Sequence, residues 1–182
     1  GRTVLITGAS RNMGKLAALT FAREGANLAI CTSTKTDELN GVADEARALG
    51  VKVVAERCDI TDAAQVAAFV GKVQKELGRL DVAVNTAGHR CRAHLAEISL
   101  EEWNKTIAVN LTGPMLICRY ATPLMMGRRW GRIINISGIA SYIGGHPTQA
   151  MVKLGIVGFT RGIARELGQY NITANCISPG GG

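Results

Sequence analysis

Aromatic side chains are scarce in this sequence, in which Phe, Trp and Tyr together make up 4% of the 182 residues. No apolar run approaches the length of about 20 residues that a membrane-spanning helix needs, and no secretory signal peptide is visible. We therefore expect no membrane-spanning helix in this sequence and no membrane partner. The hydrophobic fraction of 47% and the charged fraction of 19% exclude a disordered chain and predict a globular protein with a sizeable core.

Paired cysteines are also absent. The cysteines are scattered, odd in number and without a Cys-x-x-Cys pair: Cys31, Cys58, Cys91, Cys118 and Cys176. Such a set argues against a disulfide framework and for a reducing compartment, so we expect a cytoplasmic protein. His89, Cys91 and His94 lie close together in the sequence but match no standard zinc spacing. We therefore predict that they are loop residues near a pocket and that no metal is bound.

Basic residues exceed acidic ones, and the formal net charge is +7. The only dense basic run is Arg128-Arg129-Trp130-Gly131-Arg132, which is typical of a solvated turn before a strand. No nucleic-acid-binding motif accompanies it. A basic balance can indicate a nucleic acid, a membrane surface or an anionic ligand, and without such a motif we expect no nucleic-acid partner.

Strand and helix signals alternate from one end of the chain to the other. Short apolar runs rich in β-branched residues predict buried strands at residues 3–7, 27–32, 51–56, 80–84, 132–136 and 172–177. Amphipathic patterns between them predict helices at residues 16–23, 37–49, 62–77, 99–126 and 149–167, and the fourth could bend near Gly113-Pro114. Crossovers of this length require parallel strands. We predict one α/β domain, 1–182: a Rossmann-type doubly wound parallel sheet of at least six strands with helices on both faces.

A loop rich in small residues follows the first predicted strand and reads Thr7-Gly8-Ala9-Ser10-Arg11-Asn12-Met13-Gly14. It leads into a helix, whose first N–H groups and partial positive charge suit a pyrophosphate. Gly8 permits the tight turn, and Gly14 lets the helix approach the strand. In this position of a βαβ unit the loop predicts a dinucleotide site. The predicted cofactor contacts are Gly8, Ser10, Arg11, Asn12, Met13 and Gly14.

The end of the second predicted strand lacks the acid that binds the ribose hydroxyls in NAD-preferring sites. It reads Thr32-Ser33-Thr34-Lys35, and no Asp or Glu occurs before Asp37. Hydroxyls and a cation suit a 2′-phosphate instead, and Arg11 could add a guanidinium group that binds phosphate well. We therefore predict NADP, with Thr32 and Ser33 among its contacts, in preference to NAD.

The loop resembles the Thr-Gly-x-x-x-Gly-x-Gly fingerprint of the short-chain dehydrogenase/reductase family, and the resemblance continues along the chain. Further similar segments are Asp59-Ile60 after the third strand, Asn85-Thr86-Ala87-Gly88 after the fourth, Asn110 in the long helix, Ser137 after the fifth, Lys153 in the next helix and Pro179-Gly180 after the sixth. The resemblance implies cofactor contacts from Asp59, Ile60, Asn85, Ala87, Gly88, Lys153, Pro179 and Gly180. It implies a catalytic set of Asn110, Ser137 and Lys153.

One departure from the family pattern lies in the glycine-rich loop, where the middle glycine is Asn12. Asn tolerates left-handed backbone angles best after Gly, so the turn can survive. The side chain would crowd the phosphates, and we expect a modest loss of cofactor affinity.

A second departure affects the reaction itself. In this family a tyrosine donates a proton to the carbonyl oxygen, a serine hydrogen-bonds the same oxygen, and a lysine four residues after the tyrosine holds the nicotinamide ribose. Residues i and i+4 share one helix face, yet the residue four before Lys153 is Gln149. A carboxamide can donate a hydrogen bond but cannot release a proton near neutral pH.

The segment between Ser137 and Gln149 is also one or two residues shorter than is usual in the family, and Gly138 occupies the place where the catalytic serine often stands. Three explanations stay open. The chain is a natural variant with an impaired site, or Tyr142 or His146 replaces the tyrosine, or residues are missing from the sequence. The third is consistent with the absence, after Gly180, of the family's C-terminal substrate loop, helix and last strand.

The resemblance implies an oxidoreductase that transfers hydride between NADPH and a ketone or secondary alcohol, with 3-oxoacyl thioesters as the favoured substrates. The alternative is an NADP-binding protein of impaired activity with a sensor or structural role. Members of the family usually form homodimers or homotetramers through the helices that correspond to residues 99–126 and 149–167 here. Both helices are apolar on more than one face, which is consistent with such an interface.

Overall fold

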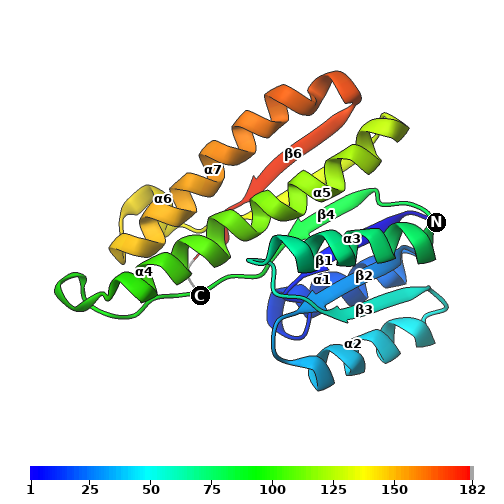
Figure 1. Cartoon of the computed structure of the whole chain (residues 1–182), viewed down its shortest axis with the longest axis horizontal. Coiled ribbons are helices and arrows are strands. Elements are labelled where there is room, and N and C mark those ends of the chain that lie inside the picture. Colours follow the sequence, from blue (N-terminus) through cyan, green and yellow to red (C-terminus); the bar gives the residue numbers. More distant parts are fainter. Residues whose placement is uncertain (181–182) are drawn as a thin grey trace.

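The computed structural model describes residues 1–180, and the last two residues of the predicted domain, Gly181 and Gly182, lie outside it. The described residues form a parallel sheet with the strand order β3-β2-β1-β4-β5-β6 (Figure 1). The strands are β1 (Thr3–Thr7), β2 (Asn27–Thr32), β3 (Val53–Arg57), β4 (Val82–Asn85), β5 (Gly131–Ile136) and β6 (Ile172–Ile177). The order and the parallel pairing confirm the predicted doubly wound α/β fold.

Helices connect the strands. They are α1 (Asn12–Arg23), α2 (Thr36–Ala48), α3 (Ala63–Leu77), α4 (Leu100–Ile107), α5 (Gly113–Arg128), α6 (Ala140–Ile143) and α7 (Pro147–Leu167), with short helical turns at η1 (Leu95–Glu97), η2 (Ala108–Thr112) and η3 (Gly168–Tyr170). No helix in the described part of the chain is both long enough and apolar enough to span a bilayer.

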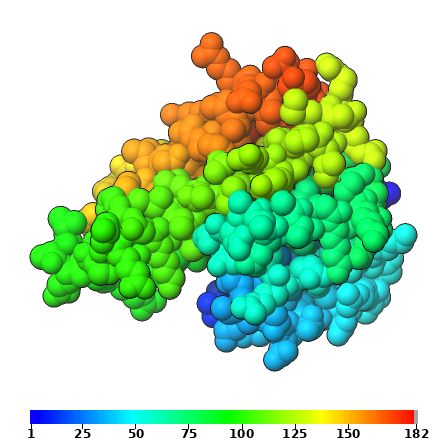
Figure 2. Space-filling model, viewed as in Figure 1, coloured from blue at the N-terminus to red at the C-terminus, as the bar shows by residue number. Residues whose placement is uncertain are grey.

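The two faces of the sheet are covered by different helices because successive strand residues point to opposite sides. Val4 and Ile6 of β1 belong to a buried cluster with α1 and α2. Leu5, between them, belongs to a second cluster with α3, α5 and the end of α7. Both α5 and α7 pack against β5, and α7 also packs against β6. The two helices lie next to one another in Figure 1 and in Figure 2. Nearly continuous burial of β1 follows from this three-layer arrangement.

The chain reverses its direction across the sheet at β1. From β1 it runs outward through β2 to β3, and it then returns to pair β4 with the other edge of β1. The loops that follow β1 and β4 therefore leave in opposite directions and open a crevice at the carboxyl ends of the strands. Ligands of doubly wound folds bind in this crevice.

The predicted helix over residues 99–126 is present as one helical run, in which α4 continues through the π-helical turn η2 into α5. Asn110 lies in that turn, and its Nδ2 donates to the carbonyl oxygens of Thr106 at 2.9 Å and of His89 at 2.8 Å. The irregular turn of this helix therefore lies at Ala108–Thr112, just before the Gly113-Pro114 step, and contains Asn110, which resembles the family's helix-bending asparagine.

Smaller differences concern the ends of elements. The helix predicted from Gln149 begins at Pro147, whose fixed φ angle suits the first helical position. β3 and β4 begin two residues later than predicted, at Val53 and Val82. Asp81, just before β4, instead accepts the Thr3 N–H at 2.8 Å through its carboxylate.

Candidate functional site

The glycine-rich loop turns sharply between β1 and α1. Gly8 has a φ angle of +64°, and a Cβ atom there would lie 2.9 Å from Cα of Ala87. A Cβ atom on Gly14 would lie 2.3 Å from the Gly8 carbonyl oxygen. Asn12 has a φ angle of 49°, which confirms the predicted left-handed conformation. Any side chain at Gly8 or Gly14 would clash with the main chain of neighbouring residues. The geometry of the turn therefore requires glycine at both positions.

The first turn of α1 is free to receive an anion. Arg11 occupies the N-cap position without a side-chain capping bond, and the first turn contains no acidic residue. Leading N–H groups of a helix have no partner within the helix and carry partial positive charge. They face the crevice between β1 and β4, so this helix end suits a pyrophosphate.

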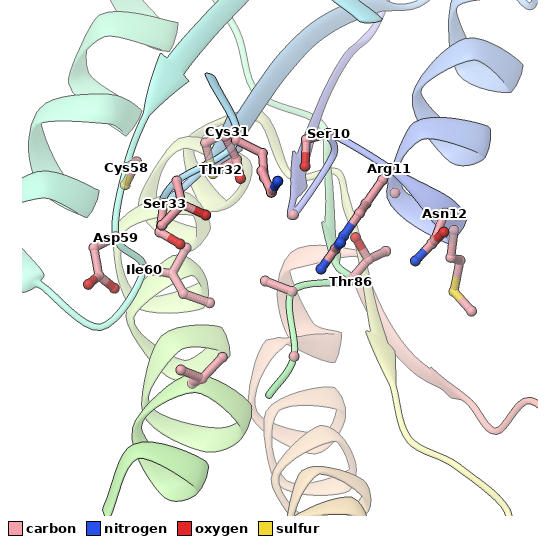
Figure 3. Close-up of a pocket in the computed structure, with 18 residues that line it drawn as sticks. Ser10, Arg11, Asn12, Cys31, Thr32, Ser33, Cys58, Asp59, Ile60 and Thr86 are labelled. Carbon is pink, nitrogen blue, oxygen red and sulfur yellow. The ribbon is translucent and has the colours of Figure 1, made fainter. Parts of the chain in front are cut away.

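An open cleft of about 300 Å³ occupies the crevice. It is lined by Gly8, Ser10, Arg11, Asn12, Met13, Gly14, Cys31, Thr32, Ser33, Thr34, Lys35, Cys58, Asp59, Ile60, Thr86, Ala87, Gly88 and Val109 (Figure 3). Loops from β1, β2, β3 and β4 thus meet there. The structure brings together most of the predicted cofactor residues, with the exception of Asn85, Lys153, Pro179 and Gly180, which do not line this cleft.

Two cations, Arg11 and Lys35, line the cleft. Lys35 pairs with Glu38 on the first turn of α2, with 3.3 Å between Nζ and Oε1. Arg11 makes no ion pair with any described residue. Among residues 1–180, Asp59 is the only acid that lines the cleft, and its Oδ1 accepts hydrogen bonds from the N–H and hydroxyl of Thr61 at 2.9 and 2.8 Å. Figure 3 shows Asp59 and Arg11 on opposite sides, so the Arg11 side favours an anion.

Two cysteines that line the cleft were not predicted there. Cys31 is the next-to-last residue of β2 and lies beside Cys58, which follows β3. The neighbouring Cys58 thiol and full burial raise the pKa of Cys31 well above its ordinary value. A neutral thiol of this kind is an apolar wall rather than a nucleophile. No pattern in the sequence indicates that an isolated cysteine lines a cleft in this way.

The turn after β4 is bonded to the end of β1. The Thr86 hydroxyl donates to the Thr7 carbonyl oxygen, and the Ala87 N–H donates to Oγ1 of Thr7 at 3.2 Å. Asn85 points away from this turn into the core, where its Nδ2 donates to Oδ1 of Asn135 at 2.8 Å. Asn85 therefore fixes β4 to β5 in this structure, whereas Ala87 and Gly88 face the cleft.

Ser137 and Lys153 meet at the carboxyl end of β5. The Ser137 hydroxyl donates to the carbonyl oxygen of Lys153 at 2.7 Å, and Nζ of Lys153 donates to the carbonyl oxygen of Ile136 at 3.1 Å. Burial lowers the pKa of Lys153 below its ordinary value. Pro179 joins this group through its carbonyl oxygen, which accepts from the Ile139 N–H at 3.3 Å. The structure thus brings three of the predicted residues to one end of the sheet.

Gln149 also lies at this end, and its amide is already used. Nε2 of Gln149 donates to the His89 carbonyl oxygen at 3.0 Å, the same oxygen that accepts from Asn110. These bonds join α7, η2 and the loop after β4 at a single main-chain atom. Gln149 is therefore a positioning residue for this loop and no source of a proton.

The two candidates for a replacement acid differ in their surroundings. Nδ1 of His146 lies 2.9 Å from the Thr148 hydroxyl, and its Nε2 lies 2.6 Å from the Ala93 carbonyl oxygen. Both ring nitrogens are therefore occupied. Tyr142 lies on α6, is 58% exposed and has no hydrogen-bond partner for its hydroxyl among residues 1–180. Neither side chain bonds to Ser137, Gln149 or Lys153.

Comparison with protein families gives one match that covers nearly the whole chain: the family described as short chain dehydrogenase matches residues 2–181. Among curated proteins, a 3-oxoacyl-[acyl-carrier-protein] reductase of Staphylococcus aureus is 36% identical over 181 residues, which are 98% of this chain and 74% of that protein. The (2S)-[(R)-hydroxy(phenyl)methyl]succinyl-CoA dehydrogenase subunit of Thauera aromatica is 37% identical over 180 residues, or 98% of this chain and 72% of that protein.

Solved structures give the same picture. An NAD⁺-bound xylitol dehydrogenase superposes with a TM-score of 0.94 at 28% identity, over 98% of this chain and 70% of that one. A putative short-chain alcohol dehydrogenase of Sinorhizobium meliloti superposes with a TM-score of 0.94 at 30% identity, over 99% and 72% of the two chains. The chain thus spans about three quarters of the length of these relatives.

Proposed function

The chain belongs to the short-chain dehydrogenase family, and on that premise we propose that it is an NADP-dependent oxidoreductase. It transfers hydride between NADPH and a ketone or secondary alcohol. The observation that carries this proposal is the cleft, where an uncapped helix end, Arg11 and the hydroxyls of Thr32 and Ser33 line one continuous surface. The helix end suits the diphosphate, and the hydroxyls of Thr32 and Ser33 together with Arg11 suit the adenosine ribose and its 2′-phosphate.

Preference for NADP over NAD rests on the charge at the β2 end of the cleft. A carboxylate at this strand end would bind the ribose hydroxyls and repel a phosphate. Here Thr32 and Ser33 stand at the strand end and Lys35 follows them. The Arg11 guanidinium, which has no acidic partner among the described residues, supplies the stronger attraction.

Ser137, Gln149 and Lys153 form what we call the reaction side of the site. Residues of this side would hold the reduced nicotinamide and the carbonyl group of the substrate. When bound, NADPH supplies the hydride. The ammonium of Lys153 has three donors, of which one binds the Ile136 carbonyl oxygen, so two are left for ribose hydroxyls. The Ser137 hydroxyl would exchange its bond to the Lys153 carbonyl oxygen for one to the substrate oxygen. Asn110 holds the bend of η2 and thereby the loop that borders the cofactor.

Substrates with an apolar chain fit the rim of the reaction side best. Ile139, Tyr142 and Ile143 follow Ser137 in the chain and are 41%, 58% and 75% exposed. Exposed Arg90 and Arg92 follow the β4 turn and favour an anionic group on the same substrate. A 3-oxoacyl thioester combines an apolar chain with an anionic carrier, which supports this substrate class.

Gln149 favours a second candidate function. With its amide bonded to the His89 carbonyl oxygen, the position of the family's tyrosine offers no proton. A protein that binds NADP without useful turnover would then act as a sensor or a structural subunit. In either case we propose a cytoplasmic homodimer or homotetramer, for which α5 and α7 offer exposed apolar residues, Met115 at 36% and Leu154 at 54% exposure.

Two measurements on the purified chain separate these functions. Fluorescence titration with NADPH and with NADH should give saturable binding with the lower Kd for NADPH. A panel of ketones and 3-oxoacyl thioesters should then be reduced with loss of NADPH absorbance. Binding without turnover would favour the second candidate, and tighter binding of NADH would contradict the assignment of NADP.

A further inference from the structure

We propose that His89, held by Glu102, donates the proton that the family's tyrosine would otherwise supply. This inference rests on the proposed reductase function. His89 is not one of the family's catalytic positions, which are the tyrosine, the serine and the lysine. The inference starts from an ion pair that the reaction described so far does not use. Nε2 of His89 lies 2.6 Å from Oε1 of Glu102, and their side chains are 25% and 31% exposed.

Glu102 is available for this contact because it has no capping role. Ser99-Leu100-Glu101-Glu102 reads as a capping box, in which the glutamate would return a bond to the N-cap. In the structure the Ser99 hydroxyl oxygen accepts the Glu102 N–H at 3.1 Å, whereas the Glu102 carboxylate turns to His89. The hydrogen bond from His89 lowers the pKa of Glu102, against the opposing effect of burial. The carboxylate is therefore ionised at neutral pH, and Nε2 carries the proton that they share.

The pair leaves the other ring nitrogen of His89 free. Nδ1 has no hydrogen-bond partner among residues 1–180. A ring with one nitrogen held by a carboxylate and the other unoccupied is the arrangement of a general acid or base with an orienting partner. His146 does not have this arrangement, because Thr148 and Ala93 occupy both of its ring nitrogens.

The main chain of His89 lies between the cofactor cleft and the position of the family's tyrosine. It directly follows Gly88, which lines the cofactor cleft. Its carbonyl oxygen accepts from Nε2 of Gln149, the residue at the position of the missing tyrosine, at 3.0 Å. Asn110 binds the same oxygen at 2.8 Å, so the main chain of His89 is fixed from two elements. The imidazole thus belongs to the residue whose main chain contacts Gln149, at the position of the family's tyrosine.

The substrate carbonyl carbon accepts the hydride of NADPH and forms the new C–H bond. The π electron pair of the C=O bond moves to oxygen, and this oxygen takes the proton from Nδ1 of the His89 imidazolium. The products are the alcohol, NADP⁺ and a neutral imidazole whose Nε2–H still donates to Glu102. Solvent returns the proton to Nδ1.

The test compares His89→Gln and His89→Ala with wild type. Loss of general acid catalysis should lower kcat by about 10²–10⁴-fold, and NADPH affinity should stay within about threefold, since both main-chain bonds remain. Added imidazole should restore part of the activity of His89→Ala. His94→Ala is the matched control, because His94 is an exposed histidine of the same loop and should keep wild-type kcat.

A second measurement needs no turnover. Nitrogen NMR of the imidazole in the cofactor-free protein should show protonated Nε2 and unprotonated Nδ1 for neutral His89. Glu102→Gln should mix the two tautomers and lower kcat. Wild-type kcat in His89→Gln would overturn the inference alone. Absence of turnover in wild type despite NADPH binding would overturn both the reductase function and this inference.

Discussion

The phosphate side of the cleft, which comprises Arg11 and the first turn of α1, differs from the reaction side in the hydrogen-bond partners of its polar groups. On the phosphate side, Arg11 and the first N–H groups of α1 have no partner among the described residues that would compete with a ligand. On the reaction side, the side chains of Ser137, Gln149 and Lys153 all donate to main-chain carbonyl oxygens. One side is prepared for an anion, and the other must exchange internal bonds before it binds substrate.

This difference has an energetic consequence. Exchange of an internal hydrogen bond for one to a ligand gains only the difference between two similar bonds. Groups without a competing partner contribute more to binding, because no internal bond is lost. We therefore expect firm cofactor binding together with slow turnover, and the following experiments test that contrast from the largest effect to the smallest.

Gly14→Ala should have the largest effect, because it disrupts the whole turn that forms the phosphate side. The new methyl group would lie 2.3 Å from the Gly8 carbonyl oxygen, so β1 and α1 would have to separate. We expect a loss of about 1–3 kcal/mol or more in the free energy of unfolding, measured by denaturant titration, and loss of saturable NADPH binding. Gly41→Ala is the control, because nothing lies within 4 Å of its Cβ position and helix propensity favours Ala. Equal NADPH affinity in Gly14→Ala and wild type would contradict the structure of the loop.

Arg11→Leu should sharpen the contrast without disturbing the fold. Loss of a charged hydrogen bond to the 2′-phosphate costs about 1.5–3 kcal/mol, which corresponds to roughly 10- to 100-fold in Kd for NADPH. The Kd for NADH should change little, since that cofactor lacks the phosphate. Arg23→Leu, at the far end of α1, is the matched control. An equal loss for both cofactors would place Arg11 at the diphosphate instead.

How far the sequence predicts this contrast depends on the distance between partners along the chain. The phosphate loop is local: Gly8, Asn12 and Gly14 lie within one βα turn, and their residue types alone predicted its conformation. The reaction side depends on contacts between distant segments, such as Gln149 with His89 and Ser137 with Lys153. Periodicity carries no information about such pairs.

For residues with two available hydrogen-bond partners, the sequence does not predict which partner the side chain binds. Glu102 fits a capping box by spacing, yet the structure pairs it with His89, which lies 13 residues away in the chain. Asn85 lies in a turn that resembles a cofactor-binding segment, yet its amide bonds to Asn135 in the core. In both cases a side chain that is distant in the sequence, His89 or Asn135, takes the place of the partner that the sequence pattern indicates. Only the packed structure shows this.

Lys153→Met tests the reaction side through pH. Burial holds the pKa of Lys153 below its ordinary value of 10.5, so the folded state binds its proton more weakly than the unfolded state. Between the two pKa values the unfolded state holds more protons, and stability therefore rises with pH in that range. Below the folded-state pKa the cost of the buried ammonium is present in full. Denaturation of wild type and Lys153→Met from pH 7 to 10.5 should show this gain in wild type only, and parallel profiles would contradict the burial of the ammonium.

Asn12→Gly should give the smallest effect and concerns the one imperfection of the phosphate side. Asn12 holds a φ angle of 49° and lines the cleft, so glycine would relieve backbone strain and remove a side chain beside the diphosphate. We expect NADPH to bind a few-fold more tightly. Asn171→Gly is the matched control: Asn171 also has a positive φ, of 58°, but lies before β6 and away from the cleft. Both variants should shift the free energy of unfolding similarly, and only Asn12→Gly should change the Kd. If the Kd of Asn12→Gly equals that of wild type, the asparagine does not crowd the diphosphate, and the slow step belongs to the reaction side alone.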